Sequence, residues 1–150
     1  MSKVAKDEGE RISFMGMDLI WKITAESSGG SLISFIQIAP PGTGVPLHSH
    51  HTEDEFILVE SGALRFRLAD ESFDVAPGDV VLMPKGVPHA FMAVGDEPAR
   101  VLFTLTLSPD SDYETMFNGL VGLGPGDFEA IQEVCAANNL EFYFPPEMPS

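Results

Sequence analysis

Four residues in the middle of the chain have the side chains and the spacing of a metal site. His48 and His50 are two residues apart, so their side chains point to the same side of an extended chain. Glu55 follows after a short turn, and His89 belongs to a separate β-rich segment. Inward residues of different strands converge in a closed barrel, where imidazole nitrogens can meet one ion at roughly 2.0–2.1 Å. Three imidazoles and one carboxylate suit Fe, Mn, Ni, Co, Cu or Zn, so we predict one divalent transition metal per chain.

Short apolar runs, separated by turn residues, surround these four residues. The run Ser31–Ala39 is apolar on both faces, as expected for a strand inside a sandwich. Short strands with turn signals between them are typical of a β-sandwich or barrel. We predict strands over Met17–Thr24, Ser31–Ala39, Glu55–Val59, Ala63–Leu68, Asp70–Ala76, Val80–Met83, Ala90–Val94 and Val101–Leu107.

The spacing of apolar residues changes from that of strands to that of helices near the end of the chain. One predicted helix has Ser108 as its N-cap and Pro109 as its first residue. A second is expected from Asp127, as N-cap, to about Asn138. The apolar face of the first helix consists of Tyr113, Met116, Phe117, Leu120 and Val121.

The length of 150 residues predicts a single domain. We divide it into a flexible arm (1–11), a β-barrel (15–107) and C-terminal helices with a tail (108–150). The formal net charge of −15 repels phosphate groups, so neither nucleic acid nor a membrane surface is an expected partner. The chain starts without an apolar signal segment, so we expect it in the cytoplasm. Cys135 is the one cysteine and is expected to be buried on a helix.

The histidines, the glutamate and nearby glycines resemble the two signature motifs of the cupin superfamily. The second motif, G-x5-P-x-G-x2-H-x3-N, ends in Ala93 here, so a polar residue at a strand end is replaced but no metal ligand is lost. Its other positions are matched by Gly78, Pro84, Gly86 and His89. The first motif, G-x5-H-x-H-x4-E-x6-G, is matched throughout by Gly42, His48, His50, Glu55 and Gly62.

This resemblance implies a mainly all-β fold, the cupin double-stranded β-helix or jelly-roll barrel, here with two C-terminal helices. In metal-binding cupins the matched residues are the ligands, which implies His48, His50, Glu55 and His89 in this chain. The segments SSGGSLISFIQIAPPGTGVPLHSH and VVLMPKGVPHAF are most similar to small cupins of the quercetin 2,3-dioxygenase-like group.

The resemblance to that group suggests a metal-dependent dioxygenase acting on a small enolisable or phenolic compound. Glu55 would then be a metal ligand and also a proton acceptor. A metal-dependent isomerase or decarboxylase would use the same site without dioxygen. A non-catalytic module that binds a small molecule is the third alternative, because one fold serves many functions.

Strand alternation indicates which residues line a substrate pocket. If Glu55 points inward, so do Ile57 and Val59, and if His89 does, so does Phe91. These residues predict an apolar pocket beside the metal. The C-terminal helices either cover the barrel mouth as a lid or only pack against the barrel.

The remaining polar residues around the motif are interpreted as surface groups. His51 would point away from His50, and Glu53 and Asp54 are expected to be solvated turn residues. The outer side of the strand Glu55–Val59 is also apolar and needs a cover. Because cupins commonly dimerise through such faces, we expect a homodimer.

Overall fold

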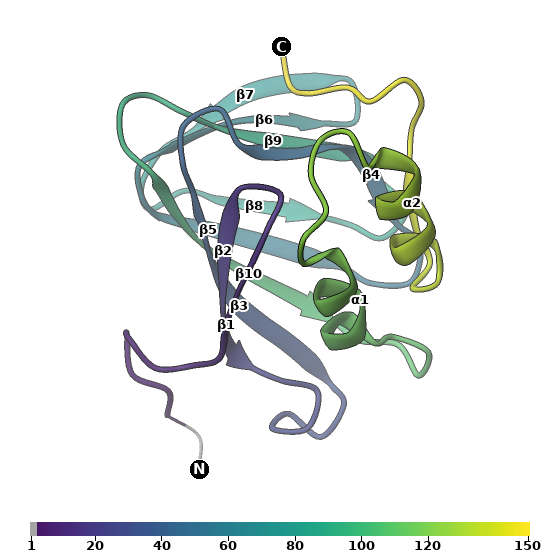
Figure 1. Cartoon of the computed structure of the whole chain (residues 1–150). Helices are drawn as coiled ribbons and strands as arrows, with labels where there is room; N and C mark the ends of the chain where they lie inside the picture. Colours follow the sequence, from purple (N-terminus) through teal and green to yellow (C-terminus); the bar gives the residue numbers. More distant parts are fainter. Residues whose placement is uncertain (1–2) are drawn as a thin grey trace.

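The computed structural model describes residues 3–150, which form eleven strands and two helices (Figure 1). The helices are α1 (Tyr113–Leu120) and α2 (Phe128–Ala136). The strands are β1 (Arg11–Phe14), β2 (Met17–Ile23), β3 (Leu32–Ala39), β4 (Gly44–His50), β5 (Glu55–Ser61), β6 (Ala63–Leu68), β7 (Glu71–Val75), β8 (Val80–Met83), β9 (His89–Val94), β10 (Ala99–Thr106) and β11 (Leu140–Phe142).

The strands form two antiparallel sheets that face each other. One has six strands in the order β1-β2-β3-β10-β5-β8, and the other has five in the order β11-β4-β9-β6-β7. Both helices lie together at one end of the two sheets (Figure 1). The prediction of a mainly β jelly-roll barrel with two C-terminal helices is confirmed.

The core lies between the sheets and follows the alternation of the strands. On β10, Val101, Phe103 and Leu105 are buried, while the residues between them are partly exposed. The Phe103 ring stacks on Phe35 of β3, with 5.3 Å between ring centroids. In β3, every residue from Ile33 to Gln37 is buried, which confirms that this strand lies inside the sandwich.

Helix α1 begins later than the sequence predicted. Its N-cap is Asp112, whose carboxylate accepts a hydrogen bond from Thr115 N at 3.2 Å. Residues 108–111 form a turn instead, in which Ser111 N donates to Ser108 O. The predicted N-cap was wrong because the Ser108 side chain contacts Ser111 and a buried carboxylate outside the helix.

Helix α2 follows Asp127, as predicted, and ends at Ala136, before the expected Asn138. The Asp127 carboxylate accepts a hydrogen bond from Gly124 N at 2.9 Å and does not cap the helix itself. Cys135 on this helix is buried, as expected, and burial raises the pKa of its thiol to about 12.

The segment before β1, predicted as a flexible arm, contacts β2. The Lys22 ammonium group donates hydrogen bonds to the carbonyl oxygens of Ala5, Lys6 and Glu8 at 2.7–2.9 Å. Residues 1 and 2 of the predicted arm lie outside the described residues. The last residue of that arm, Arg11, opens β1.

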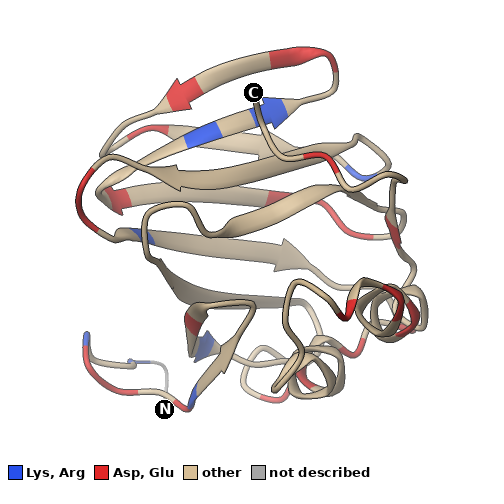
Figure 2. Ribbon diagram, turned by 45° about the horizontal axis from the view of Figure 1, so that its top comes forward, with Lys and Arg blue, Asp and Glu red and all other residues tan. Residues whose placement is uncertain are grey.

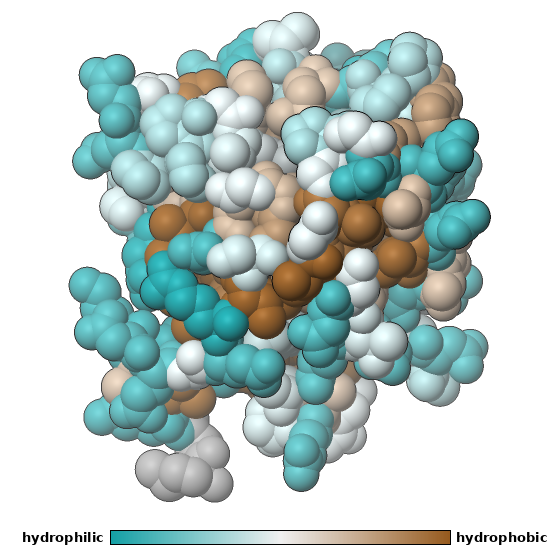
Figure 3. All heavy atoms as spheres, viewed as in Figure 1, coloured by the Kyte–Doolittle hydropathy of each residue, from teal (hydrophilic) through white to brown (hydrophobic). Residues whose placement is uncertain are grey.

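The surface combines dispersed acidic groups with an apolar band on one face. Figure 2 shows Asp and Glu spread over the sheets, the helices and the N-terminal segment. Figure 3 shows hydrophobic residues gathered in a band across the middle of one face, between the β1–β2 hairpin and the helices. Within residues 3–150, neither helix has the length and hydropathy to cross a membrane.

Candidate metal centre

Two neighbouring strands bring the three predicted histidine ligands together. His48 and His50 share a face of β4, and His89 at the start of β9 lies directly opposite His48 in the strand register. The ring centroids of His48 and His89 are 4.3 Å apart, and those of His48 and His50 are 5.2 Å apart. One nitrogen from each of the three rings lies within 4.8 Å of the others. This buried triad is consistent with a metal site.

Local features of β4 explain this register. Gly44 permits close pairing with β9, because a Cβ there would lie 1.9 Å from the carbonyl oxygen of Phe91. The register shifts between Val45 and His48. In the shifted segment, Leu47 N donates to Glu147 O in the C-terminal tail, while Pro46 has no N–H to donate. β4 also pairs with β11, so the histidine strand is held from both sides.

The hydrogen bonds of the three rings fix which nitrogen of each carries a proton. His48 Nδ1 lies 2.8 Å from Pro46 O, and His89 Nδ1 lies 3.2 Å from Val87 O. A carbonyl oxygen only accepts, so both Nδ1 atoms donate, and the Nε2 lone pairs are left to bind an ion. His50 Nδ1 lies 2.8 Å from the Tyr113 hydroxyl, which leaves His50 Nε2 toward the same point.

Glu55, the first residue of β5, brings a carboxylate from the opposite sheet to these nitrogens. Its Oε1 is 3.1 Å from His89 Nε2, and its Oε2 is 3.8 Å from His50 Nε2. Among residues 3–150, His89 Nε2 is the buried side-chain N or O atom left without a hydrogen bond. Two lone-pair atoms this close repel unless a proton or a metal cation is shared between them. The donor set therefore fits a divalent metal.

Burial also keeps two of the histidines, His48 and His50, neutral. Desolvation lowers the pKa of His48 well below the usual 6.5, and the neighbouring His89 and His50 lower it further. Desolvation, with His89 next, likewise lowers the pKa of His50 well below that value. Neutral imidazoles are the form that binds metals.

The sequence analysis misplaced one residue of this region and missed the role of another. Glu53 was predicted to be solvated, but its side chain is only 1% exposed. That prediction was wrong because Glu53 Oε1 accepts a hydrogen bond from the Tyr113 hydroxyl at 2.8 Å, at the start of α1. Strand alternation could have indicated that Glu53 is buried, because Glu53 lies two residues before Glu55 and so points to the same side of an extended chain. Burial and the adjacent Glu53 raise the pKa of Tyr113, so its hydroxyl stays protonated.

Two other polar residues lie where the sequence placed them, outside the site. His51 is exposed and its Nε2 is 2.8 Å from the Glu141 carboxylate, so it points away from the triad. Asp54 accepts a hydrogen bond from Lys85 N at 2.9 Å in a neighbouring turn.

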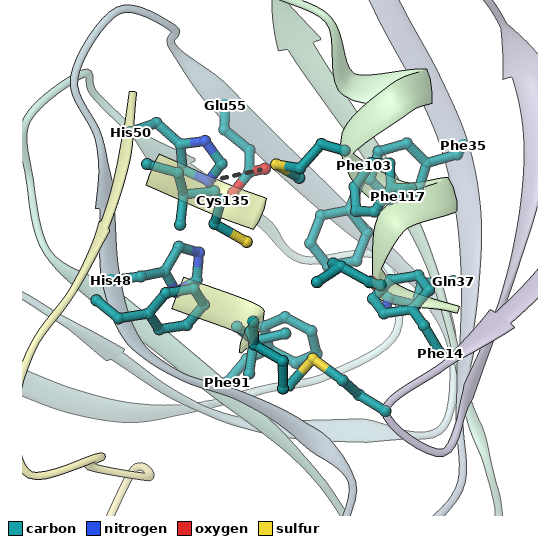
Figure 4. Close-up of a pocket in the computed structure, with 17 residues that line it drawn as sticks. Phe14, Phe35, Gln37, His48, His50, Glu55, Phe91, Phe103, Phe117 and Cys135 are labelled. Carbon is teal, nitrogen blue, oxygen red and sulfur yellow. Dashed lines mark ion pairs between the residues drawn. The ribbon is translucent and has the colours of Figure 1, made fainter. Parts of the chain in front are cut away.

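A small cavity of about 50 Å³ adjoins the site (Figure 4). In Figure 4, His48, His50 and Glu55 lie on one side of it, and Phe14, Phe117 and Gln37 lie on the other. Both helices contribute side chains to its wall. The helical side chains that line it are Met116, Phe117, Leu120, Ile131 and Cys135.

The predicted pocket residues lie at different depths. Phe91 lines the cavity, as does Glu55. Ile57 and Val59 also point inward, but both are fully buried in the core and neither is among the lining residues. They follow Glu55 along β5, where they are paired with β10 in the packed part of the barrel. Gln37, which the sequence analysis did not consider, lines the cavity and is 3% exposed.

Two Streptomyces proteins are similar to this chain in sequence. Protein SchB of Streptomyces halstedii is 33% identical over 95 residues, which is 63% of this chain and 67% of SchB. Polyketide synthase CurC of Streptomyces cyaneus is 31% identical over 88 residues, which is 59% of this chain and 56% of CurC. The match thus spans about two thirds of one relative and little more than half of the other.

Solved structures share the fold. A sugar phosphate isomerase from Silicibacter pomeroyi aligns with a TM-score of 0.63 and 25% identity, over 71% of this chain and 76% of that protein. A predicted oxalate decarboxylase from Thermotoga maritima gives 0.63 and 22%, over 72% and 99%. The polyketide cyclase RemF from Streptomyces resistomycificus gives 0.62 and 21%, over 72% and 80%.

The protein-family model for the cupin domain (Cupin_2) matches residues 35–105, which include all three histidines and the strands that carry them. The two-sheet barrel has the same fold as the solved structures above, of which the Silicibacter pomeroyi isomerase is described as a member of the cupin superfamily. The sequence match, the barrel and the buried histidine triad agree, and the chain belongs to the cupin superfamily.

Proposed function

We propose that this chain is a metal-dependent enzyme that acts on a small enolisable or phenolic compound. The observation that carries the proposal is the convergence of three imidazole lone pairs and one carboxylate beside an aromatic-lined cavity. Small-molecule sites commonly combine apolar walls with a few polar groups in this way. A divalent metal held there would act as a Lewis acid toward an enolate or phenolate oxygen.

The residues around the cavity have separate tasks in this proposal. The imidazoles of His48, His50 and His89 would hold the metal. Glu55 completes the ligand set, and its carboxylate is the group placed to accept the proton lost when the substrate enolises. Phe91 and the other aromatic walls exclude water, which strengthens electrostatic interactions inside the cavity.

The first reaction that we propose is oxidation by dioxygen, as in the quercetin 2,3-dioxygenase-like cupins that the motifs resemble. Isomerisation, decarboxylation or cyclisation without dioxygen is the second candidate. It is favoured by the names of similar proteins, which include a polyketide synthase and a polyketide cyclase. Polyketides carry ketones that enolise, so both candidates share the same substrate chemistry.

The test separates the reactions by their need for oxygen. The protein is loaded in turn with each of the six candidate metals and incubated with flavonols or β-diketones, in air and under argon. A dioxygenase takes up one dioxygen per substrate consumed and stops under argon, whereas the second candidate gives the same product in both gases. If a ligand raises Tm but none of the metals and gases gives turnover, the result would contradict an enzymatic role and indicate a binding module.

Glu55→Gln tests the proton-accepting role within the same assay. The amide cannot accept the proton, so kcat is expected to fall by about 10²–10⁴-fold. The three histidines remain, so metal content measured by elemental analysis is expected to stay near that of the wild type. An unchanged kcat in the metal-loaded variant would remove Glu55 from the mechanism.

A further inference from the structure

We propose that Tyr113 and Glu53 position His50 for metal binding, and that through this contact they link helix α1 to the metal site. The inference rests on the proposed metal site, but its first test needs no metal. It concerns one chain of hydrogen bonds that runs from a buried carboxylate, through a phenol, to one imidazole.

The direction of these hydrogen bonds follows from the chemistry of the three groups. The Glu53 carboxylate only accepts, and Tyr113 has one hydroxyl hydrogen, which it donates to Glu53 Oε1 at 2.8 Å. The Tyr113 oxygen must then accept at its 2.8 Å contact with His50 Nδ1. His50 is therefore held as the Nδ1–H tautomer, whose Nε2 carries the lone pair that a metal needs.

Glu53 is itself held in place by the loop that leads into α1. Its Oε2 accepts hydrogen bonds from Thr52 Oγ1 at 2.6 Å and from Ser108 Oγ at 3.4 Å, and it also contacts Ser111 Oγ. The side chain is 1% exposed, so water does not compete for these hydrogen bonds. This carboxylate is a fixed acceptor, which orients the Tyr113 hydroxyl.

His50 differs from the other two histidines in the source of its hydrogen-bond partner. His48 and His89 each donate to a backbone carbonyl two residues earlier in their own segment, so their tautomers are fixed locally. The partner of His50 is a side chain at the first turn of α1. That helix also supplies Phe117 to the cavity wall.

The link must act in both directions, as any coupling between two equilibria does. When α1 moves away, His50 loses its acceptor and the metal is held less tightly. When the metal is bound, His50 is fixed and Tyr113 is retained, so α1 stays over the cavity.

The first experiment measures the tautomer of His50 by NMR, on metal-free protein with isotope-labelled imidazole nitrogens at mildly alkaline pH. The wild type is expected to show His50 with its proton on Nδ1. In Tyr113→Phe, a substantial share of the signal is expected to move to the Nε2–H form. Tyr143→Phe is the matched control, because the Tyr143 hydroxyl contacts Ser49 Oγ at 3.1 Å and no ligand ring. An unchanged His50 tautomer in Tyr113→Phe would overturn the proposal.

The second experiment measures Zn²⁺ affinity by competition with a chelator. Tyr113→Phe is expected to weaken binding about 10–100-fold, and Tyr143→Phe to leave it unchanged. Glu53→Gln keeps an oxygen that accepts from Tyr113, so it is expected to lose less affinity than Glu53→Ala. Equal losses in these two variants, or none in Tyr113→Phe, would contradict the positioning role. A wild type that binds no metal refutes the proposed function, while the tautomer experiment still decides the role of Tyr113.

The third experiment tests the link to α1 by amide hydrogen exchange with and without Zn²⁺. Zinc is expected to slow exchange in α1 of the wild type, and this slowing is expected to be lost in Tyr113→Phe at saturating zinc. The same slowing in both proteins would show that α1 is not coupled through this hydroxyl.

Discussion

At the scale of single residues, metal binding at this site depends on which imidazole nitrogens carry a hydrogen. Each histidine gives its Nδ1 hydrogen to an acceptor, which directs Nε2 toward the others. Burial keeps His48 and His50 neutral by lowering their pKa values. Together these effects prepare a metal-binding arrangement in the metal-free chain.

The ligand assignment predicts which histidines are needed for metal. His48→Ala and His89→Ala each remove one of three imidazoles, so both are expected to lose stoichiometric metal in elemental analysis. His51→Ala is the control, because His51 is exposed and paired with Glu141, and it is expected to keep wild-type metal content. Retained stoichiometric metal in both ligand variants would contradict the assignment.

The lowered pKa values predict how stability depends on pH in the metal-free protein. Below pH 6.5 the unfolded chain protonates His48 and His50, while the folded chain keeps them neutral. The unfolded state then binds more protons, so the free energy of unfolding falls as pH decreases, by up to about 1.4 kcal/mol per pH unit for each histidine. The loss continues down to the folded-state pKa values.

Urea denaturation at several pH values between neutral and mildly acidic measures this slope. A variant with Gln at positions 48 and 50 is expected to lose most of it, because neither amide titrates. If the wild type and this variant showed the same slope, the pH dependence would belong to other groups.

At the scale of elements, the sequence predicted the regular strands and missed those that tertiary contacts define. Strands with clear alternation, such as β10, were predicted within one or two residues. β11 is only three residues long and exists because it pairs with β4. β4 begins with Gly-Val-Pro, a sequence of weak strand propensity, and is absent from the predicted strands. The start of α1 was missed because buried Glu53, a long-range partner, binds the Ser108 hydroxyl that was predicted to cap it.

The residues of the candidate site also divide into those that a sequence pattern predicts and those that only tertiary contacts define. The three histidines could be predicted because their spacing matches a motif. Glu53 and Tyr113 are 60 residues apart in sequence and contact each other only through the fold, so strand alternation could place Glu53 inside but no local pattern indicates their contact.

The stability of the helices depends on their packing against the barrel. Shortening a buried helical side chain is therefore expected to lower the free energy of unfolding strongly. Ile131 in α2 is 1% exposed and lines the cavity. Ile131→Ala leaves a void and is expected to lower the free energy of unfolding by about 2–5 kcal/mol. Val121→Ala, at a side chain that is 50% exposed, is expected to change it by less than about 0.5 kcal/mol. Urea denaturation compares the two, and equal losses would contradict a packed role for α2.

At the scale of the whole molecule, the outer side of one sheet exposes several apolar side chains. Strand β8 is an edge of the six-stranded sheet, and Val80 and Leu82 on it are 60% and 58% exposed. Phe56 on the adjacent β5 is 39% exposed. Two copies of a chain with a net charge of −15 repel each other. A second copy can therefore bury this patch only where few charged side chains face each other.

We therefore expect a homodimer through the outer face of β5 and β8. Leu82→Lys places a charge in this face and is expected to give a monomer in light scattering at micromolar concentration. Val121→Lys introduces the same charge at the end of α1 and is expected to leave the dimer intact. A wild type that stays monomeric at high concentration, or a dimeric Leu82→Lys, would refute this interface.

The tightness of the cavity has a consequence for the kinetics of this protein. A cavity of about 50 Å³ is smaller than the roughly 150 Å³ of an apolar cavity that binds benzene. A ligand with an aromatic ring is larger than this space, so it fits only when side chains that line the cavity, those of the two helices among them, move aside. The rate of ligand binding should then reach a plateau as the ligand concentration rises. The plateau should be the same for chemically different ligands, because it equals the rate of the conformational change in the protein itself.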